Sequence, residues 1–441
     1  MKLISSIVSL ICFGVLSSQE PSTDKQIWSL QDCIDYALEH NITVKDAKLD
    51  GALAEVDYEK IRAQRLPNLF GSASQNLSNG NSIDPITSDY VSSQIASTNL
   101  GMSTSVTLFQ GNQLNNQVKQ GKLVLDQNSL YIQEARNNVT LSVVESYLQA
   151  LYNKEAILVQ ENILKNSQEE EKQAKARLDA GSIAMQDYTD AQSQTANNRY
   201  NLITAKNNYN LRIVELKQLL QLNLRQTIQL VDIDENIEVL IPVLDKMEVY
   251  ERALQNLPEV DAGKLNITIS EKDLDIAKGG YLPTLSLTGS LGSGYTSIDY
   301  TNFVDQLDVN FNQRIGLSLS VPIFNRKQTK AQVKNAEINI DKAKLQLKTI
   351  ENEVYQKVEN GWQNLNSAQE QLAAAEVAQT AAEESYRLAQ KRYDLGALST
   401  ADLIVSQNLY TNTQENYLQA KYLSILYYQL MEFYQGNEIK L

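Results

Sequence analysis

Two stretches of the sequence place charged residues at matching distances from a glycine. The first reads RLDAGSIAMQDYTDAQ over residues 177–192, and the second reads RYDLGALSTADLIVSQ over residues 392–407. Arg, Asp, Gly, Asp and Gln recur in register, at a constant offset of 392 − 177 = 215. Because each glycine interrupts a long helical pattern, each stretch predicts a helix-turn-helix tip with acidic and basic side chains beside the turn.

The chemistry available to these tips is electrostatic. Asp187 and Asp190 are three residues apart and therefore share one helix face. Asp402 occupies the position of Asp187 in the second stretch. Carboxylates gathered in this way attract cations, and Arg177 and Arg392 are candidate ion-pair partners for them. The alternative interpretation is that all of these side chains are solvated surface charges.

Enzyme chemistry finds no support elsewhere in the sequence. There is no glycine-rich phosphate-binding loop and no nucleophile elbow, and no carboxylate pair stands out among the 53 acidic residues. With His40 as the only histidine, neither a metal site nor a cofactor is expected. Cys33 is the only cysteine beyond the N-terminal leader, and its pattern favours a buried small residue over a reactive thiol. The net charge of 39 − 53 = −14 argues against nucleic acid as a partner.

The N-terminus predicts export. MKLISSIVSLICFGVLSSQE combines one lysine, an apolar run and a short stretch of small residues. This pattern is typical of a secretory signal peptide, here residues 1–19, with cleavage within residues 17–20. No later stretch approaches twenty consecutive apolar residues, so any crossing of a membrane would have to be made by β-strands.

The two tips belong to a larger duplication. Four features recur in one order, namely a helix that ends at Leu-Pro, a β-like region, a very long helix, and a glycine turn into a second helix. The matching segments are RLPNL at 65–69 with YLPTL at 281–285, and VTLFQGNQ at 106–113 with VPIFNRKQ at 321–328. Residues 20–441 are therefore predicted to form one domain of two structural repeats, about 28–221 and 246–436.

The β-like regions predict two hairpins, at about 67–109 and 283–324. Apolar residues alternate there with Ser, Thr, Gly and Asn, which indicates one apolar face and one wet face. Runs of about 9–10 residues have the length that crosses a bilayer as tilted strands, whereas a soluble pair of hairpins is the alternative. Polar loops are expected at roughly 78–96 and 293–312. The residues predicted to face lipid are Leu100, Met102, Val106, Leu285, Leu287, Leu317 and Leu319.

Four strands are too few to close a barrel around a lumen, and open strand edges are not tolerated in lipid. The chain must therefore associate if it enters a membrane. Three copies would supply 3 × 4 = 12 strands, which is within the range of outer membrane barrels.

The helical segments are unusually long. Residues 110–175 and 325–390 lack proline and predict two helices of about 66 residues, each roughly 100 Å long. Shorter helices are predicted at 42–66, 184–220, 258–282 and 400–434. Because one return helix and one segment before Leu-Pro together nearly equal a long helix, the shorter helices are expected to stack end to end beside the long ones.

Signal peptide, duplicated plan, hairpins and paired long helices together resemble the TolC-like outer membrane efflux protein family over essentially the whole mature chain. WSLQDCIDYALEHN at 28–41 is similar to that family's opening helix, and RYDLGALSTADL at 392–403 is similar to its second tip. The resemblance implies an α+β membrane fold. In it, a homotrimer forms a twelve-stranded transmembrane β-barrel, with four strands per chain, continued by a long periplasmic α-helical barrel of paired coiled-coil helices.

The resemblance also implies a location and partners. The protein would lie in the outer membrane, in contact with its lipid, with a large periplasmic portion. It would work with a periplasmic adaptor (a membrane fusion protein) and an inner-membrane transporter, in a tripartite efflux or type I secretion system that exports drugs, metabolites or proteins. The alternative is an exported coiled-coil scaffold or adaptor-like structural protein without a pore.

Roles at the second tip follow from the same resemblance. Tyr393 matches a tyrosine that helps to tie the family's gate shut, and Asp402 matches an aspartate that projects into its lumen. Val405 and Leu398 stand where the family has a second aspartate and a gate arginine, so the family's gate is not copied at these two positions.

In a trimer, three copies each of Asp187, Asp190 and Asp402 would form acidic rings that favour cations. Small residues at the turns would let the tips dock to the adaptor, although a glycine there also serves simply to end a helix. The candidate docking residues are Gly181, Ser182, Gly396, Ala397, Leu398 and Ser399.

Overall fold

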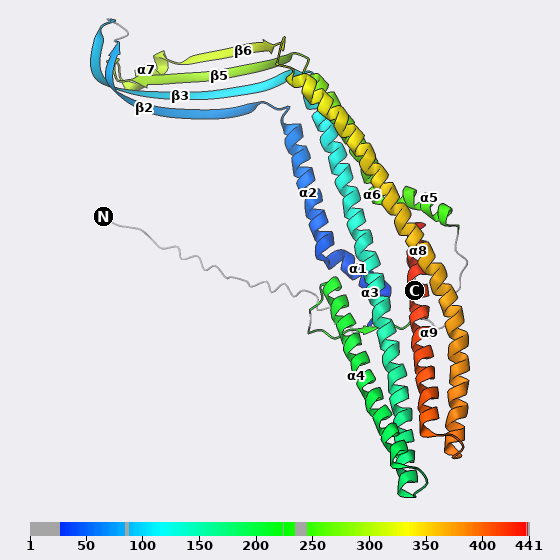
Figure 1. Ribbon diagram of the computed structural model, residues 1–441. Coiled ribbons are helices and arrows are strands. Elements are labelled where there is room, and N and C mark those ends of the chain that lie inside the picture. Colours follow the sequence, from blue (N-terminus) through cyan, green and yellow to red (C-terminus); the bar gives the residue numbers. More distant parts are fainter. Residues whose placement is uncertain (1–26, 84–87, 224, 234–244, 438, 440–441) are drawn as a thin grey trace, which may run out of the picture.

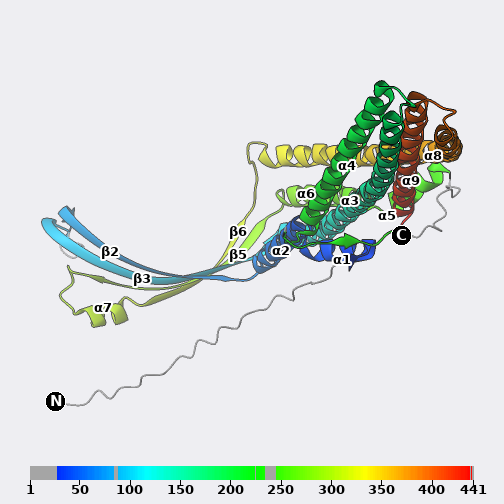
Figure 2. The same cartoon turned by 90° about the horizontal axis from the view of Figure 1, so that it is seen from below.

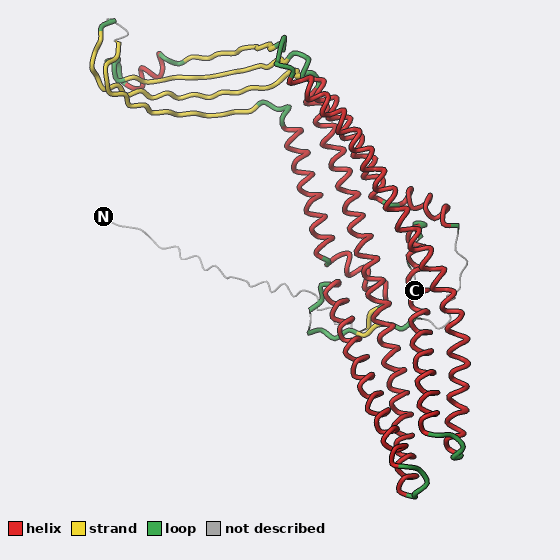
Figure 3. Tube along the Cα trace, in the orientation of Figure 1, coloured by secondary structure: helices red, strands yellow, loops and turns green. Residues whose placement is uncertain are grey.

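The protein is elongated, with its long strands at one end and its longest helices running away from them (Figure 1 and Figure 3). The computed structural model describes residues 27–83, 88–223, 225–233, 245–437 and 439. The predicted signal peptide lies outside the described residues, and its boundary and those of the two repeats stay predictions.

Two helices of equal length form the main axis. Helix α3 (Gln113–Asp179) and helix α8 (Gln328–Asp394) have 67 residues each, which corresponds to roughly 100 Å. Helix α4 (Met185–Leu220) returns along α3, and helix α9 (Thr400–Tyr434) returns along α8. The predicted pair of long helices with shorter return helices is therefore confirmed.

Shorter helices complete the layer next to the sheet. Helix α2 (Ile42–Ala63) packs on α3, and helix α6 (Pro258–Gly279) packs on both α3 and α8. Figure 1 shows α2 beside the half of α3 that lies near the sheet and α4 beside the other half. The two short helices thus follow each other along α3, as predicted. Among the described residues, no helix is both long enough and apolar enough to cross a membrane.

The largest core lies at mid-height, where α1 (Leu30–His40) packs against α3 and α4. Next to it, β1 (Ile27–Trp28) pairs in parallel with β4 (Gln229–Leu230). The Tyr147 hydroxyl of α3 donates to the carbonyl of Trp28 at 3.1 Å and to that of Val231 at 2.8 Å. Cys33 is fully buried in this core, as its pattern predicted. A second core joins α5 (Lys246–Asn256) to α8 and α9.

Four antiparallel strands form the sheet, in the order β2-β3-β5-β6. They are β2 (Asn68–Ile83), β3 (Tyr90–Gln110), β5 (Thr284–Thr296) and β6 (Asn312–Ser320). The pairing of β3 with β5 joins the two halves of the chain, with one register shift between Thr107 and Phe109. Figure 2 shows the sheet as a curved ribbon that projects from the helices. The outer edges of β2 and β6 pair with no strand in the described part of the chain.

The two connections at the outer end of the sheet differ from prediction. The polar loop expected at 78–96 is wrong in extent, because β2 and β3 continue to pair as far as Ile83 and Tyr90. Backbone hydrogen bonds hold this extension, and they do not depend on which side chains are apolar. The second connection contains a short helix, α7 (Phe303–Val309). The buried Gln306 side chain anchors it by donating to the carbonyls of Thr296 and Thr301.

A close backbone approach fixes the junction between sheet and helices. Gly111 links β3 to α3 with a φ of 56°, in the left-handed region that favours glycine. A Cβ added there would overlap the carbonyl oxygen of Gly279 at the end of α6. Only glycine therefore lets the strand turn into the long helix while the two backbones touch.

Candidate functional site

The strand register places the predicted lipid-facing residues on one face of the sheet. Directly paired residues share a face, and Met102 pairs with Leu291, while Val106 pairs with Leu287. In turn, Leu287 pairs with Leu317, and Leu285 pairs with Leu319. Leu100 is two residues from Met102 and so joins the same face. All seven predicted residues therefore share one face, while their contact with lipid stays a prediction.

The opposite face is small and polar. Its central rows pair Ser105 with Thr288 and Gly101 with Gly292. Further along, Ser318 of β6 pairs with Ser286. Apart from Phe70 of β2, which pairs with Ser103, this face has little apolar surface and suits contact with water. The sheet thus has one face suited to hydrocarbon and one suited to an aqueous lumen.

The two helical tips share one backbone turn. Gly181 has a φ of 72° and Gly396 a φ of 73°, a conformation that costs a residue with a Cβ about 1–2 kcal/mol. The next residues, Ser182 and Ala397, donate their N–H groups back to the carbonyls of Arg177 and Arg392. Both turns are therefore the glycine-terminated helix ends known as Schellman motifs. Because an added Cβ would meet no atom within 4 Å, the backbone conformation and not crowding requires glycine.

The remaining candidate docking residues take part in the local structure of the second tip. Ser399 is the N-cap of α9, where its hydroxyl oxygen accepts the N–H of Asp402 at 3.1 Å. Leu398 is half-buried against a small cluster that contains Tyr393 and Leu403. Ser182 and Ala397 are exposed. Docking itself stays a prediction.

The predicted acidic residues lie in the first two turns of the return helices. Asp187 accepts the N–H of Ala184 at 3.2 Å, and Asp402 accepts the hydroxyl of Ser399 at 2.7 Å. Both carboxylates therefore cap the positive ends of their helices. Asp402 is exposed, whereas Asp187 and Asp190 are half-buried. Asp187 and Asp402 thus have a structural role that is independent of any role in a lumen.

Arg177 connects the two tips within one chain. Its guanidinium donates to the carbonyls of Tyr393 at 2.7 Å and Asp394 at 3.0 Å, and it lies 4.5 Å from the Tyr393 ring centroid. The expected ion pair between Arg177 and a tip aspartate is not found among the described residues. The guanidinium instead binds the negative end of the α8 dipole. Its counterpart Arg392 is exposed.

A buried polar cluster that the sequence did not reveal joins four helices just above the tips. Glu170 of α3 accepts the Tyr386 hydroxyl of α8 at 2.7 Å and the Gln407 amide of α9 at 3.3 Å. Gln407 also donates to the Tyr386 hydroxyl at 3.0 Å and accepts from Asn198 of α4 at 3.5 Å. Burial raises the pKa of the Glu170 carboxyl, although hydrogen bonds from Tyr386 and Gln390 oppose this. The cluster holds the two helical hairpins together.

Further polar contacts between α3 and α9 continue from this cluster toward mid-height. Gln160 donates to Glu415 at 2.7 Å, and the Tyr422 hydroxyl donates to Glu155 at 2.6 Å. Burial raises the pKa of the Glu415 carboxyl. The two hairpins are therefore held by hydrogen bonds over much of their length, as well as by apolar packing.

Comparison with known proteins decides which family has this arrangement. The sequence matches the outer membrane efflux protein family over residues 33–221 and 249–425, which is most of the chain. The chain belongs to the outer membrane efflux protein family. That family is one of efflux proteins and not of enzymes.

Individual relatives show how far the likeness reaches. TolC of Escherichia coli, named an outer membrane protein, is 26% identical over 256 residues, which are 57% of this chain and 51% of TolC. The chain thus spans about half the length of the curated relatives it matches. CusC has a TM-score of 0.80 at 17% identity, covering 93% of this chain and 92% of its own. For VceC of Vibrio cholerae the TM-score is 0.78 at 15% identity, covering 93% and 97%. These structures establish the fold: a β-barrel end continued by a long helical barrel.

The tip residues that the resemblance matches to the family's gate have the following surroundings in this structure. Val405, expected at the family's second aspartate position, is exposed, and Leu398, expected at its arginine position, packs in the tip cluster. The Tyr393 hydroxyl is buried and has no hydrogen-bond partner among the described residues. Contacts between the hairpins near these tips come instead from Arg177, from Glu170 and from Gln194, whose amide donates to Asn408 at 2.8 Å.

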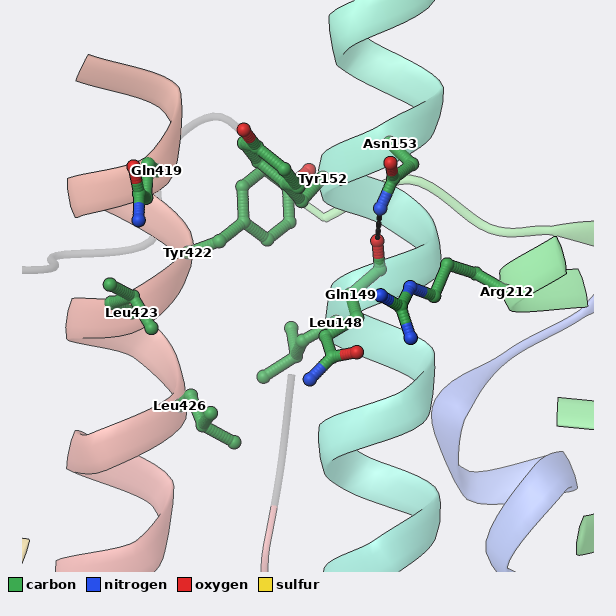
Figure 4. Close-up of a pocket in the computed structure, with 9 residues that line it drawn as sticks. All are labelled: Leu148, Gln149, Tyr152, Asn153, Arg212, Gln419, Tyr422, Leu423 and Leu426. Atoms are coloured by element: carbon green, nitrogen blue, oxygen red, sulfur yellow. Dashed lines mark hydrogen bonds between the residues drawn. The ribbon is translucent and has the colours of Figure 1, made fainter. Parts of the chain in front are cut away.

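A groove of about 290 Å³ lies between α3 and α9 at mid-height (Figure 4). Tyr152, Tyr422 and Leu426 line it, together with Arg212 of α4. Arg212 pairs with Glu215 at 2.7 Å, and the other lining residues are Leu, Gln, Asn and Tyr. Within the described ranges, no group of His, Cys, Asp and Glu side chains is arranged to hold a metal ion.

Proposed function

We propose that three copies of this chain form an outer membrane channel that is the exit duct of a tripartite efflux or type I secretion system. One observation carries the proposal: a four-stranded sheet with an apolar face, a Ser/Thr/Gly face and two outer edges, joined directly to helices of 67 residues. The apolar face suits lipid, and the small polar face suits an aqueous lumen.

The need to pair the sheet edges argues for a closed assembly. An unpaired backbone N–H or C=O in hydrocarbon costs several kcal/mol. Pairing β2 of one copy with β6 of the next removes every edge when the ring closes. Three copies give 3 × 4 = 12 strands, an even number within the range of outer membrane barrels.

The helices then form the wall of a tunnel through the periplasm. Its height of roughly 100 Å follows from the length of α3 and α8. Threefold symmetry gathers six tips at the far end, and Asp187, Asp190 and Asp402 would form acidic rings toward the lumen there. The domain proposed for this function is residues 20–441, as two repeats, after removal of signal peptide 1–19.

The partners proposed are a periplasmic adaptor at the tips and an inner-membrane transporter beyond it. The exported class is drugs, metabolites or proteins. The exposed turns at Ser182 and Ala397 support docking, because they offer six similar small-residue surfaces to an adaptor ring.

Expression in an efflux-deficient bacterium tests the proposal. The chain is expected in outer membrane fractions, to migrate on a denaturing gel as a slower oligomer band when unheated and as a faster monomer band after boiling, and to restore dye efflux. A protein that fractionates with the periplasm and migrates identically with and without heating would instead be a scaffold without a pore.

A further inference from the structure

Arg314 is the only charged residue on the four strands of the sheet. The segments 68–83, 90–110, 284–296 and 312–320 contain no Asp, Glu or Lys and no other Arg. Every other polar residue on these strands is Ser, Thr, Asn, Gln or Tyr. A charged side chain costs free energy when it is removed from water. The place of Arg314 in the sheet therefore determines whether it lies in water or in lipid.

The register places Arg314 near the middle of the sheet's depth. It pairs with Ser290, which is the central residue of β5, six residues from Thr284 and six from Thr296. At a rise of about 3.3 Å per residue, each end of β5 is roughly 20 Å away along the strand. In a membrane-spanning barrel, this position is close to the bilayer midplane.

The same register decides which face carries the guanidinium. Ser290 pairs with Ser103, and Ser103 pairs with Phe70, so Arg314 ends a row that crosses the polar face. The next residue, Ile315, is on the apolar face with Leu317. On a lipid face at the midplane, an arginine would cost about 2–4 kcal/mol. Register and energetics thus agree that Arg314 faces the lumen.

No neighbouring acid neutralises this charge. Ser290, Asn312 and Ser318 are the nearby polar residues on its face, and none of them ionises. Arg314 is exposed and forms no ion pair with any described residue. The nearest acidic side chains in sequence belong to the connection that contains α7, where Asp308, six residues from Arg314, is the nearest. There Asp299 accepts the N–H of Thr301, and Asp305 accepts the Asn302 amide.

We propose that Arg314 is a selectivity residue that makes the barrel favour anionic solutes. The inference rests on the proposed trimeric channel, in which three copies form a positive ring at mid-depth. Rings of arginine or lysine favour anions in pores. The channel would then have two opposed filters in series, with acidic rings at the tips and a basic ring in the barrel.

Salt screening gives the expected size of the effect. In a wide barrel the ring acts on ions at a distance, over a screening length of about 30 Å at 0.01 M salt but only about 3 Å at 1 M. In planar bilayers at 0.01 M KCl, Arg314→Gln should lower the chloride-to-potassium permeability ratio about twofold. The ratio at 1 M KCl should stay unchanged. Ser290→Arg, which adds a charge in the same row, should raise the ratio.

These currents separate the two hypotheses. An unchanged ratio for Arg314→Gln at low salt, in channels of normal conductance, would overturn the role of Arg314. A wild-type protein without conductance would contradict the proposed channel instead.

Thiol labelling tests the facing independently of selectivity. Arg314→Cys should react with a charged, membrane-impermeant thiol reagent in intact outer membranes, whereas Ile315→Cys should not. The native Cys33 is fully buried and gives little background. If Ile315→Cys reacted and Arg314→Cys did not, Arg314 would face lipid and the inference would be overturned.

Discussion

The sheet and the helical tips lie at opposite ends of the molecule and use different kinds of interaction. In the sheet, backbone pairing supplies the structure, and the side chains need only alternate between apolar and small polar types, as Leu317 and Ser318 do. At the tips, individual side chains supply the structure. Glu170 and Arg177 both lie on α3, and both contact α8 of the other helical hairpin.

The two tips also differ from each other despite their common turn. Both end a long helix with a glycine at positive φ, and Asp187 and Asp402 cap the helices that follow. Yet Arg177 spans the tips, whereas the equivalent Arg392 is exposed. The two tips therefore share their backbone turn, while their side-chain contacts differ. The sheet should tolerate replacement of one apolar residue by another, or of one small polar residue by another. The tips should not tolerate comparably conservative replacements.

The largest effect is expected in the sheet, when a charged side chain replaces an apolar one. Leu317→Arg places a charge on the apolar face and should cost up to about 2–4 kcal/mol per chain, the value at the bilayer midplane, so that trimers fail to assemble. Ser318→Arg, one residue away on the polar face, should assemble nearly normally. The readout is the heat-sensitive oligomer band on denaturing gels. Equal assembly of both variants would show that the two faces have been assigned incorrectly.

A second large effect is expected from bulk at the tips. Gly181→Trp combined with Gly396→Trp should abolish dye efflux while trimers still reach the outer membrane, because docking needs small turns. The control is the double alanine variant, which has the same backbone strain of about 1–2 kcal/mol per site without the bulk. Full efflux by the double tryptophan variant would show that the tips are not required for efflux.

A moderate effect is expected from the buried cluster. Tyr386→Phe removes the hydroxyl that Glu170 accepts and should destabilise the contact between hairpins by about 1–3 kcal/mol. Tyr410→Phe is the matched control, since its ring stacks on Tyr386 with centroids 5.6 Å apart. Spin labels at Ser182→Cys and Ala397→Cys would report the separation of the tips. If both variants leave that separation equally narrow, the cluster does not hold the hairpins together.

The same labels test a pH dependence. Because burial raises the folded-state pKa of Glu170 above its ordinary value of 4.5, its stabilising contribution is complete below that value. The contribution is lost as pH rises through the raised pKa. The tips should therefore be held more tightly in acid, and Glu170→Gln should remove this trend. A trend that persists in Glu170→Gln would have to come from another group.

The smallest effect is expected from the acidic residues. Replacing Asp187, Asp190 and Asp402 by Asn keeps an acceptor oxygen for the caps and removes 3 × 3 = 9 charges per trimer. Block by a trivalent cation should weaken several-fold, while assembly is unchanged. Asp261→Asn, which breaks an exposed pair with Lys264 on α6, is the control. Equal block in wild type and the triple variant would place these aspartates outside the lumen.

Regular features of the protein could be predicted from its sequence, because they depend on periodicity. The alternation of apolar and polar residues around Met102 and Leu317 predicted the two faces of the sheet. The long segments without proline predicted α3 and α8. The extension of β2 to Ile83 was missed, since a strand of Ser and Asn has no apolar alternation to detect. Helix α7 was missed because it has only seven residues and is held by the Asn302 N-cap and by side-chain contacts of Gln306.

The contacts between the hairpins could not be predicted from one sequence. Glu170 and Tyr386 are 216 residues apart, and nothing in the local pattern distinguishes Glu170 from the other acidic residues. Arg177 was singled out by the repeat, but its acceptors are backbone carbonyls, which no side-chain pattern reveals. Such contacts depend on how the two hairpins lean together.

Single-channel recording of the purified protein in planar bilayers tests most directly whether the two-faced sheet closes into a pore. Discrete, long-lived conductance steps are expected from the heat-sensitive oligomer, with none after boiling. Ser318→Arg should alter the conductance, while Leu317→Arg should yield no channels. A folded oligomer of normal mobility that inserts into bilayers and passes no current would show that the sheet does not close into a pore.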